Sequence, residues 1–265
     1  MLKRLVFITM LVLAAARAEA LEFTDVYFSP SEPGWGAFLV QSDTFQFMAF
    51  FIYGPDGKPT WYTAELTNDG TGNYTGTLYA ITGTYFANPW QGYNYSSAGT
   101  ASFKPTDIYH ATLTYTVTGV GTVTKAVQRQ TLTPYVFAGD YSGSMSGSIS
   151  GCTDPAQNDP AFRGRYGLAV TQVGDTSATL TFSFADVNHS GIVCTVSGPL
   201  THLGRLYQLN AQLSCTGPGQ GGNPHSVTID SLHPTGQGIE GHLTGSTGGG
   251  CAVSLHFAAV HAVNN

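Results

Sequence analysis

Charged side chains are scarce in this chain of 265 residues, since Asp, Glu, Lys and Arg together make up 10% of it. The basic residues number 10 against 16 acidic ones. Nucleic acids and anionic membrane surfaces are bound through clustered Lys and Arg, which this composition does not supply. We therefore expect neither nucleic acid nor an anionic lipid surface as a partner.

Catalytic and cofactor motifs are missing as well. The stretches 143–147 and 147–151 have the glycine spacing of a serine-hydrolase elbow, but Met145 and Ile149 stand where the serine belongs. The chain contains no H-E-x-x-H zinc motif, no P-loop and no dinucleotide fingerprint. We predict no cofactor and no enzymatic activity. A secreted hydrolase with dispersed catalytic residues remains the alternative, because a triad assembled in space leaves no motif.

Long apolar runs are confined to the first twenty residues. Lys3 and Arg4 precede an apolar stretch at 5–16, and A-E-A at 18–20 matches a cleavage site, so 1–20 reads as a signal peptide. No later run approaches the roughly 20 residues that cross a membrane. Loss of the leader removes three basic residues and one acidic residue, which leaves 7 against 15, a net charge of −8. We expect an exported protein, periplasmic or extracellular, that does not insert into the membrane.

Cysteine is absent from the first half of the chain. The second half contains four, Cys152, Cys194, Cys215 and Cys251. An even number of cysteines in an exported chain indicates disulfides, and no C-x2-C spacing supports a metal site instead. A hairpin turn at Gly204 would place Cys194 opposite Cys215, which leaves Cys152 to pair with Cys251.

Helical periodicity is also absent after the leader, and short alternating runs bounded by turn residues take its place. We expect eight strands between 23 and 131 and eight more between 139 and 260. The clearest run alternates Ala111 and Leu113 with Thr112 and Thr114. Short strands joined by local turns favour two tandem eight-stranded antiparallel up-and-down barrels, of the calycin or avidin kind. Two β-sandwiches are the alternative.

The two halves of the chain are faintly similar to each other. Residues 34–44 align by eye with 166–176, 74–83 with 204–213, and 101–119 with 227–245. The shared order and spacing indicate a tandem duplication with its seam between 133 and 140. We therefore divide the mature chain into a first domain at 21–134 and a second at 135–265.

The first half carries a recognisable pattern. Residues 29–36 read S-P-S-E-P-G-W-G, followed by F-F-I-Y at 50–53 and D-G-K-P-T-W-Y at 56–62. This resembles a family of exported bacterial β-domains with N-P-x-E-x-G-W-G, F-x-Y-D-x-x-G-x-P-x-W and a closing G-V-x-x-x-K-x-I-x-R-Q. The last element corresponds to 119–130 with one extra residue, and Ser29 and Gly54 depart from the pattern. The resemblance spans 25–132 and implies a β fold and export. The family has no agreed activity, so function stays open.

Two cations are expected to point into the first barrel. If strands 109–118 and 122–131 pair about Val120, Lys125 and Arg129 lie on the apolar side. Buried cations need partners, for which Glu32 and Glu65 are the candidates. One interpretation is a structural ion pair that closes a barrel end. The other is a ligand site at a barrel mouth lined by Trp35 and Trp61.

The segment 85–95 is rich in both aromatic and polar residues, with Trp90 and Tyr93 near its centre. Such a surface suits stacking on a glycan or docking a peptide. We prefer the alternative, a loop packed inward over a barrel end, because exposed aromatic patches are uncommon in monomers.

Histidines gather in the second half, and His242 and His256 are expected to face each other on the outer surface near Glu240. No known metal motif includes them, so we predict no metal site. The expected function is a non-catalytic binding or accessory protein of the bacterial envelope, whose ligand is a glycan, a peptide or a small molecule. A purely structural envelope protein is a further alternative, and the oligomeric state is open.

Overall fold

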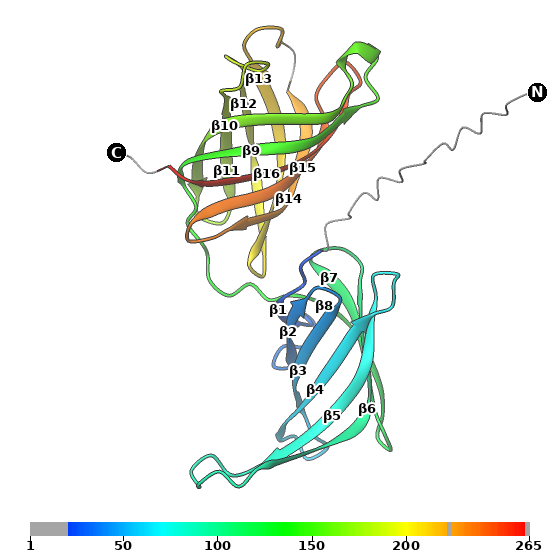
Figure 1. Cartoon of the computed structure of the whole chain (residues 1–265). Helices are drawn as coiled ribbons and strands as arrows, with labels where there is room; N and C mark the ends of the chain where they lie inside the picture. The colour runs from blue at the N-terminus through cyan, green and yellow to red at the C-terminus, as the bar shows by residue number, and fades with distance from the viewer. Residues whose placement is uncertain (1–20, 222–223, 263–265) are drawn as a thin grey trace, which may run out of the picture.

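The computed structural model describes residues 21–221 and 224–262, and the predicted signal peptide at 1–20 lies outside them. The fold is all-β, as the alternating runs predict, and consists of two eight-stranded antiparallel meanders (Figure 1). Within the described residues, no helix is long and apolar enough to cross a membrane.

Barrel 1 is formed by the first eight strands, each paired with its neighbours in the chain. They are β1 (Asp25–Phe28), β2 (Gly36–Ser42), β3 (Phe45–Tyr53), β4 (Pro59–Asn68), β5 (Tyr74–Gly83), β6 (Tyr93–Pro105), β7 (His110–Val117) and β8 (Gly121–Arg129). A short seam between β1 and β8 closes the ring through Tyr27 opposite Arg129 and Phe28 opposite Gln128.

Barrel 2 follows after a linker that contains the predicted seam. Its elements are β9 (Gly139–Ser150), the 3-10 turn η1 (Pro155–Gln157), β10 (Asp159–Val173), β11 (Ser177–Phe184), β12 (Val193–Leu203), β13 (Leu206–Thr216), β14 (His225–Pro234), β15 (Gly238–Ser246) and β16 (Ala252–His261). Ten residue pairs join β16 to β9 and close this ring.

The period-2 pattern sorts side chains between the inside and the outside of each barrel, because successive residues of a strand point to opposite faces. On β7, Ala111 and Leu113 are buried, whereas Thr114 bonds through its hydroxyl to Thr124 of β8 on the outer face at 3.1 Å. Each fully buried Leu or Phe contributes about 1.5–3 kcal/mol of burial free energy. Barrel 1 buries Met48 and Phe50 in this way, and barrel 2 buries a separate core.

The same hydrogen-bonded latch holds the start of each barrel. In barrel 1 the Tyr27 hydroxyl donates to the Phe23 carbonyl at 3.0 Å, and the Phe23 N–H donates to Gln41 Oε1 at 3.2 Å. In barrel 2 the hydroxyl of Tyr141 donates to the Phe137 carbonyl at 2.7 Å, and the Phe137 N–H donates to Gln172 Oε1 at 3.0 Å. The match supports the proposed duplication.

The latch also corrects our alignment by one residue. Placing 34–44 over 166–176 pairs Gln41 with Val173, whereas the hydrogen bonds make Gln41 the counterpart of Gln172. A slip by one would place apolar inward residues over outward ones, so the latch determines the correct correspondence.

Both predicted disulfides are confirmed, Cys152 with Cys251 and Cys194 with Cys215. The second pair lies in register across the β12–β13 hairpin, whose turn is at Gly204 and Arg205 as expected. Two disulfides are typical of an oxidising environment outside the cytoplasm.

The two barrels touch where the β12–β13 turn of barrel 2 meets the closing seam of barrel 1 (Figure 1). The Arg205 backbone N–H donates to Asp25 Oδ2 at 3.1 Å. Gly204 has φ of +67°, and a Cβ there would approach Asp25 Oδ2 to 2.2 Å, so this contact requires glycine. Nearby, the Tyr109 hydroxyl accepts from the Ser231 N–H at 2.9 Å. We call this end of each barrel the junction end and the opposite end the open end.

Candidate functional site

The expected ion pair at the open end of barrel 1 forms between Lys125 and Glu32. Lys125 Nζ lies 2.6 and 2.7 Å from the two Glu32 oxygens, and both side chains remain partly exposed. The hydrogen bond from Lys125 holds the pKa of the Glu32 carboxyl below its usual value. The indole N–H of Trp35 lowers this pKa further without forming a hydrogen bond to the carboxyl.

Trp35 and Trp61 do not line one mouth, which corrects the hypothesis of a ligand site between them. Trp35 is half-buried and packs on the core of barrel 1, as Tyr62 and Tyr115 also do. Trp61 points outward and is 54% exposed, because Tyr62 and the next alternate residues of β4 take the inner face. Glu65 shares the outer face with Trp61 and is exposed.

Arg129 points inward as expected, but its partner is Asp25 and neither of the two predicted glutamates. The guanidinium is fully buried, with NH1 2.9 Å from Asp25 Oδ2 and Nε donating to the Ile108 carbonyl at 2.8 Å. Four residues of strand separate Lys125 from Arg129, about 13 Å. Arg129 therefore lies at the junction end. Strand β8 is also shifted by two residues from the expected register, with Leu113 opposite Lys125.

The segment 85–95 is not packed inward, so our preferred interpretation of it was wrong. Strands β5 and β6 run on to Gly83 and Tyr93 and project beyond the barrel as a two-stranded ribbon (Figure 1). Trp90 is 70% exposed, and Tyr93 and Tyr95 are similarly exposed. Their rings form a row with Tyr79, with centroids 5.9–6.5 Å apart from one ring to the next. We call these four side chains the aromatic ribbon.

Barrel 2 contains a feature that sequence reasoning missed, a cavity of about 600 Å³ at its open end. Most of the side chains that line it are apolar and come from seven strands: Met145, Ile149, Phe162, Phe182, Phe184, Val196, Leu213, Leu243, Val253 and Leu255. Both disulfides contribute to the wall. The volume is typical of sites for small molecules, which are concave and largely apolar with a few polar groups.

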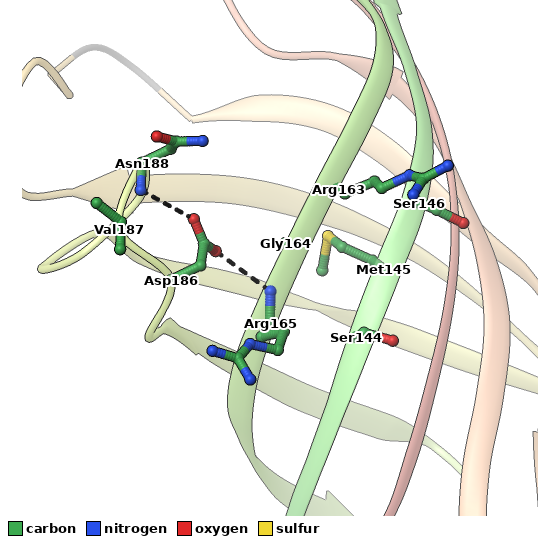
Figure 2. A pocket seen from close by; sticks show the side chains of 9 residues that line it. All are labelled: Ser144, Met145, Ser146, Arg163, Gly164, Arg165, Asp186, Val187 and Asn188. Carbon is green, nitrogen blue, oxygen red and sulfur yellow. Dashed lines mark hydrogen bonds between the residues drawn. The ribbon is translucent and has the colours of Figure 1, made fainter.

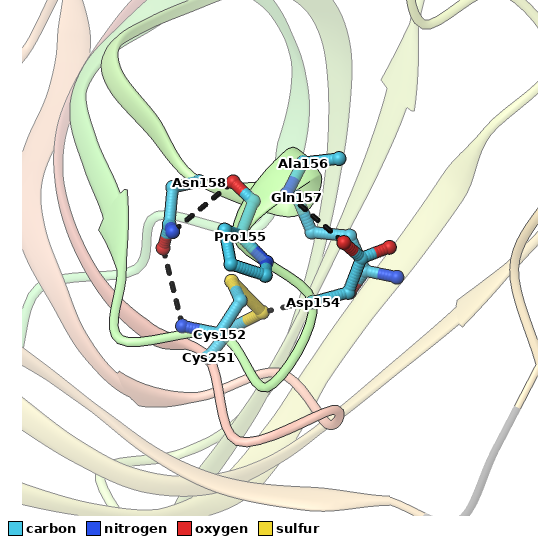
Figure 3. Close-up of a disulfide and its surroundings, with 7 residues drawn as sticks. All are labelled: Cys152, Asp154, Pro155, Ala156, Gln157, Asn158 and Cys251. Atoms are coloured by element: carbon cyan, nitrogen blue, oxygen red, sulfur yellow. Dashed lines mark hydrogen bonds between the residues drawn. A yellow bond between two sulfur atoms is a disulfide. The ribbon is translucent and has the colours of Figure 1, made fainter.

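A disulfide and several hydrogen bonds hold the loops at the rim of this cavity (Figure 3). Cys152 and Cys251 join the 151–158 loop to the 247–251 loop. Asn158 Oδ1 accepts from the Cys152 N–H at 3.1 Å, and Asp154 caps η1 by accepting from the Ala156 N–H at 3.0 Å. Because the crosslink restrains the loops that surround the opening, the mouth is held open in a defined shape before any ligand arrives.

Polar side chains gather at the rim rather than in the depth of the cavity. They are Gln157, Asp159, His189, Gln220 and His225. The His189 ring lies 4.9 Å from the Phe162 ring, and its Nδ1 is 2.6 Å from Asp186 Oδ1. Burial opposes ionisation of Asp186, but hydrogen bonds from His189 and from backbone N–H groups outweigh it, so the pKa of Asp186 lies below its ordinary value. An apolar cavity with a polar rim fits a molecule that has an apolar body and one polar end.

A second hollow of about 540 Å³ lies between β9, β10 and the 186–188 segment (Figure 2). Arg163 and Arg165 of β10 lie beside Ser144 and Ser146 of β9 there. Asp186 accepts from the Arg165 backbone N–H at 3.2 Å and closes one side. The two guanidinium groups give this groove a positive character, which suits contact with an anionic group.

The outward histidines pair as expected but build no metal centre. The rings of His242 and His256 stack with centroids 4.1 Å apart, and His242 Nδ1 lies 3.4 Å from Asp230. Glu240 is bonded to His233 instead, at 3.1 Å. Among the described residues, no group of three or more His, Cys, Asp or Glu side chains can hold a metal ion.

Comparison of the chain with protein-family models and with curated proteins finds no match. The resemblance of residues 25–132 to exported β-domains therefore stays a prediction, and the function has to be argued from the geometry of the chain.

Proposed function

We propose that this chain is an exported, non-catalytic binding protein of the bacterial envelope, and that its ligand is a small, largely apolar molecule held in the cavity of barrel 2. The observation that carries the proposal is the apolar lumen of about 600 Å³ at the open end of that barrel. Closed barrels of eight strands have room for one small ligand when side chains do not fill them.

The polar rim supports an orientation for such a ligand. Val196, Leu213 and Leu243 offer apolar contact in the depth, whereas His189 and Gln157 lie near the opening. Burial of apolar surface contributes about 25 cal/mol per Å². A polar group left in the depth would lose its hydrogen bonds to water without replacement. The polar end of the ligand therefore stays at the rim.

The test is a titration that reports from inside the lumen. All three tryptophans, Trp35, Trp61 and Trp90, belong to barrel 1. Phe184→Trp places a reporter in the cavity wall in a conservative aromatic exchange. Fatty acids of increasing chain length, aromatic alcohols and soluble sugars are the probes. We expect saturable emission changes with the apolar probes that appear in Phe184→Trp and not in the parent protein, and no such difference with the sugars.

A matched pair of variants on β16 identifies the site. Val253 faces the cavity, whereas Val260 is exposed on the outer face. Val253→Phe fills part of the lumen and should weaken binding about tenfold or more, since a missing or misplaced methylene group alone changes binding by roughly 10–200-fold. Val260→Phe should leave affinity unchanged. No saturable probe, or equal affinity in both variants, would refute the proposal.

The aromatic ribbon favours a second candidate function, docking of a glycan or an extended peptide. Trp90, Tyr93 and Tyr95 present large rings with polar tips to solvent, next to the amides of Gln91 and Asn94. Such amphipathic rings stack on sugars and hydrogen-bond at the same time. Loss of glycan or peptide binding in Trp90→Ala, with barrel 2 binding intact, would support this function. A panel without any ligand for the ribbon would exclude it.

A further inference from the structure

The outer face of β2, β3 and β4 in barrel 1 is unlike the other described outer faces of the chain. Six side chains on it are 36–56% exposed: Phe38, Val40, Phe45, Phe47, Phe51 and Trp61. The strand register makes them neighbours, with Val40 opposite Phe47 and Phe51 opposite Trp61. The Phe38 and Phe51 rings lie 5.4 Å apart. We call these six side chains the aromatic wall.

Strand β3 at the centre of the aromatic wall is apolar on both faces. Met48 and Phe50 fill the lumen, and Phe47 and Phe51 face outward. A strand with one solvent-exposed face alternates apolar and polar residues, whereas a strand that is covered on both faces is continuously apolar. The sequence F-Q-F-M-A-F-F-I-Y is that of a strand covered on both sides.

The rest of the surface shows what an uncovered face of these barrels looks like. On the opposite side of barrel 1, β7 and β8 expose threonines that bond to each other, such as Thr116 to Thr122 at 2.8 Å. On barrel 2, β9 alternates serine with its inward residues. Outside the 85–95 segment, the exposed aromatic side chains of the described barrel strands are thus concentrated on this one face, where water is a poor partner for them.

We propose that the aromatic wall is the interface through which two copies of this chain form a dimer. Whole aromatic side chains expose on the order of 150–250 Å², so the six residues at these exposures present roughly 550 Å². That is about two thirds of the roughly 800 Å² that each partner contributes to a standard interface. Homodimer interfaces are more apolar than the remaining protein surface, as this wall is.

The geometry of the wall selects a second copy over other occupants. Two apolar sheet faces pack against each other at about 10 Å with their strands nearly aligned. A second copy supplies such a face. Contact about a two-fold axis requires a surface that is complementary to itself, and a broad apolar face meets this requirement. The described outer faces of barrel 2 are polar and do not offer an equivalent surface.

The side chains in and around the aromatic wall disfavour a sugar or a membrane as its binding partner. Four of the six side chains of the wall are phenylalanines, whose rings carry no hydrogen-bonding group for sugar hydroxyls, in contrast to the polar tips of the aromatic ribbon. The charged residues next to the wall are mainly acidic, with Asp43 and Glu65 exposed beside it. Anionic headgroups would be repelled by them, because membrane surfaces attract polybasic segments.

Sedimentation of the purified protein over a concentration series tests the proposal. We expect a dimer at micromolar concentrations. Phe38→Asp places a charge in the wall, and Thr114→Asp places the same charge on the opposite face of the same barrel. Loss of a central aromatic contact raises the dimer dissociation constant about thirtyfold or more. We therefore expect monomers for Phe38→Asp and an unchanged dimer for Thr114→Asp.

A second variant guards against a folding defect. Phe47→Ser removes an outward ring without adding charge, and its melting temperature at low concentration should match that of the wild type, whereas dimerisation weakens. A wild-type protein that stays monomeric, or a dimer that survives both wall variants, would overturn the proposal. So would a monomer that binds vesicles of phosphatidylethanolamine and phosphatidylglycerol through the wall, since the occupant would then be a membrane. These outcomes are independent of ligand binding in barrel 2.

Discussion

Barrel 1 and barrel 2 share one topology and the same hydrogen-bonded latch at their first strand, yet they distribute their apolar residues differently. Barrel 1 packs Trp35, Tyr62 and Tyr115 on its core and carries the aromatic wall outside. Barrel 2 has a polar exterior and keeps a cavity of about 600 Å³ inside. The comparison shows that one strand order can support either an apolar outer surface or an internal cavity. Which of the two forms depends on whether the large apolar side chains lie on the outer or the inner face of the sheet.

Crosslinking is the largest expected difference between the barrels, because all four cysteines lie in barrel 2. The Cys152–Cys251 bond closes a loop with a sequence separation of 99 residues. Replacement of Cys152 and Cys251 by alanine should lower the unfolding free energy of barrel 2 by about 2–5 kcal/mol. Calorimetry reports both barrels, and tryptophan fluorescence reports barrel 1. A tryptophan transition that drops as far as the calorimetric one would show that the barrels unfold as one unit.

Arg129 and Lys125 of β8 form ion pairs at opposite ends of barrel 1, and the two pairs should differ in how much they stabilise the protein. Arg129→Met leaves Asp25 buried without its partner and should destabilise the protein by about 3–5 kcal/mol. Lys125→Met removes a partly exposed pair and should have a much smaller effect, because water solvates both groups. Chemical denaturation measures both changes. Asp25→Asn combined with Arg129→Met should recover part of the loss, and equal effects of the two single variants would contradict the assignment.

The shared latch predicts a loss of stability in both barrels, and a larger loss in barrel 1, where Gln41 Oε1 also accepts from the buried Gln46 amide at 3.1 Å. Gln41→Ala and Gln172→Ala each remove the acceptor for a phenylalanine N–H. Loss of such a bond in a partly buried site costs about 1–3 kcal/mol. Tryptophan fluorescence follows the first variant and calorimetry the second. A large loss in one barrel alone would show that the common geometry does not have a common energetic role.

The smallest expected effect is a loss of stability at acid pH that arises from Asp186, beside the rim of the barrel 2 cavity. The folded-state pKa of Asp186 lies below its unfolded value, which is about 3.9. Its ionised form therefore stabilises the fold fully above that pH, and the contribution disappears as the pH falls through the folded pKa. The stability difference between wild type and Asp186→Asn should shrink below about pH 4. A difference that is constant from neutral pH to acid would refute this role.

Much of the architecture could be predicted from local pattern. Alternation at Ala111 to Thr114, the turn at Gly204 and the cysteine spacing led to sixteen strands and both disulfide pairs. The inward direction of Lys125 and Arg129 also followed, because side-chain direction depends on parity and survives a register error of two residues. The partner of Arg129 did not follow, since Asp25 reaches it through closure of the ring and neither residue is near the other in sequence.

The candidate sites were harder to predict for the same reason. Trp61 and Glu65 were assigned to a mouth because their strand was known but its inner face was not. The ribbon at 85–95 was expected to fold inward, and the extension of β5 and β6 decided otherwise. A signal for the aromatic wall was present in the continuous apolar run at 47–53.

Strand order and cysteine pairing depend on the spacing of strands and turns along the chain or on simple counting, so the amino-acid sequence was sufficient for them. The cavity of barrel 2, the pairing of Asp25 with Arg129 and the position of the aromatic wall arise only when distant strands close into a ring. Volume left between side chains and exposure of a face are properties of the packed whole. They depend on which side chains meet across the barrel, and local sequence does not contain that information.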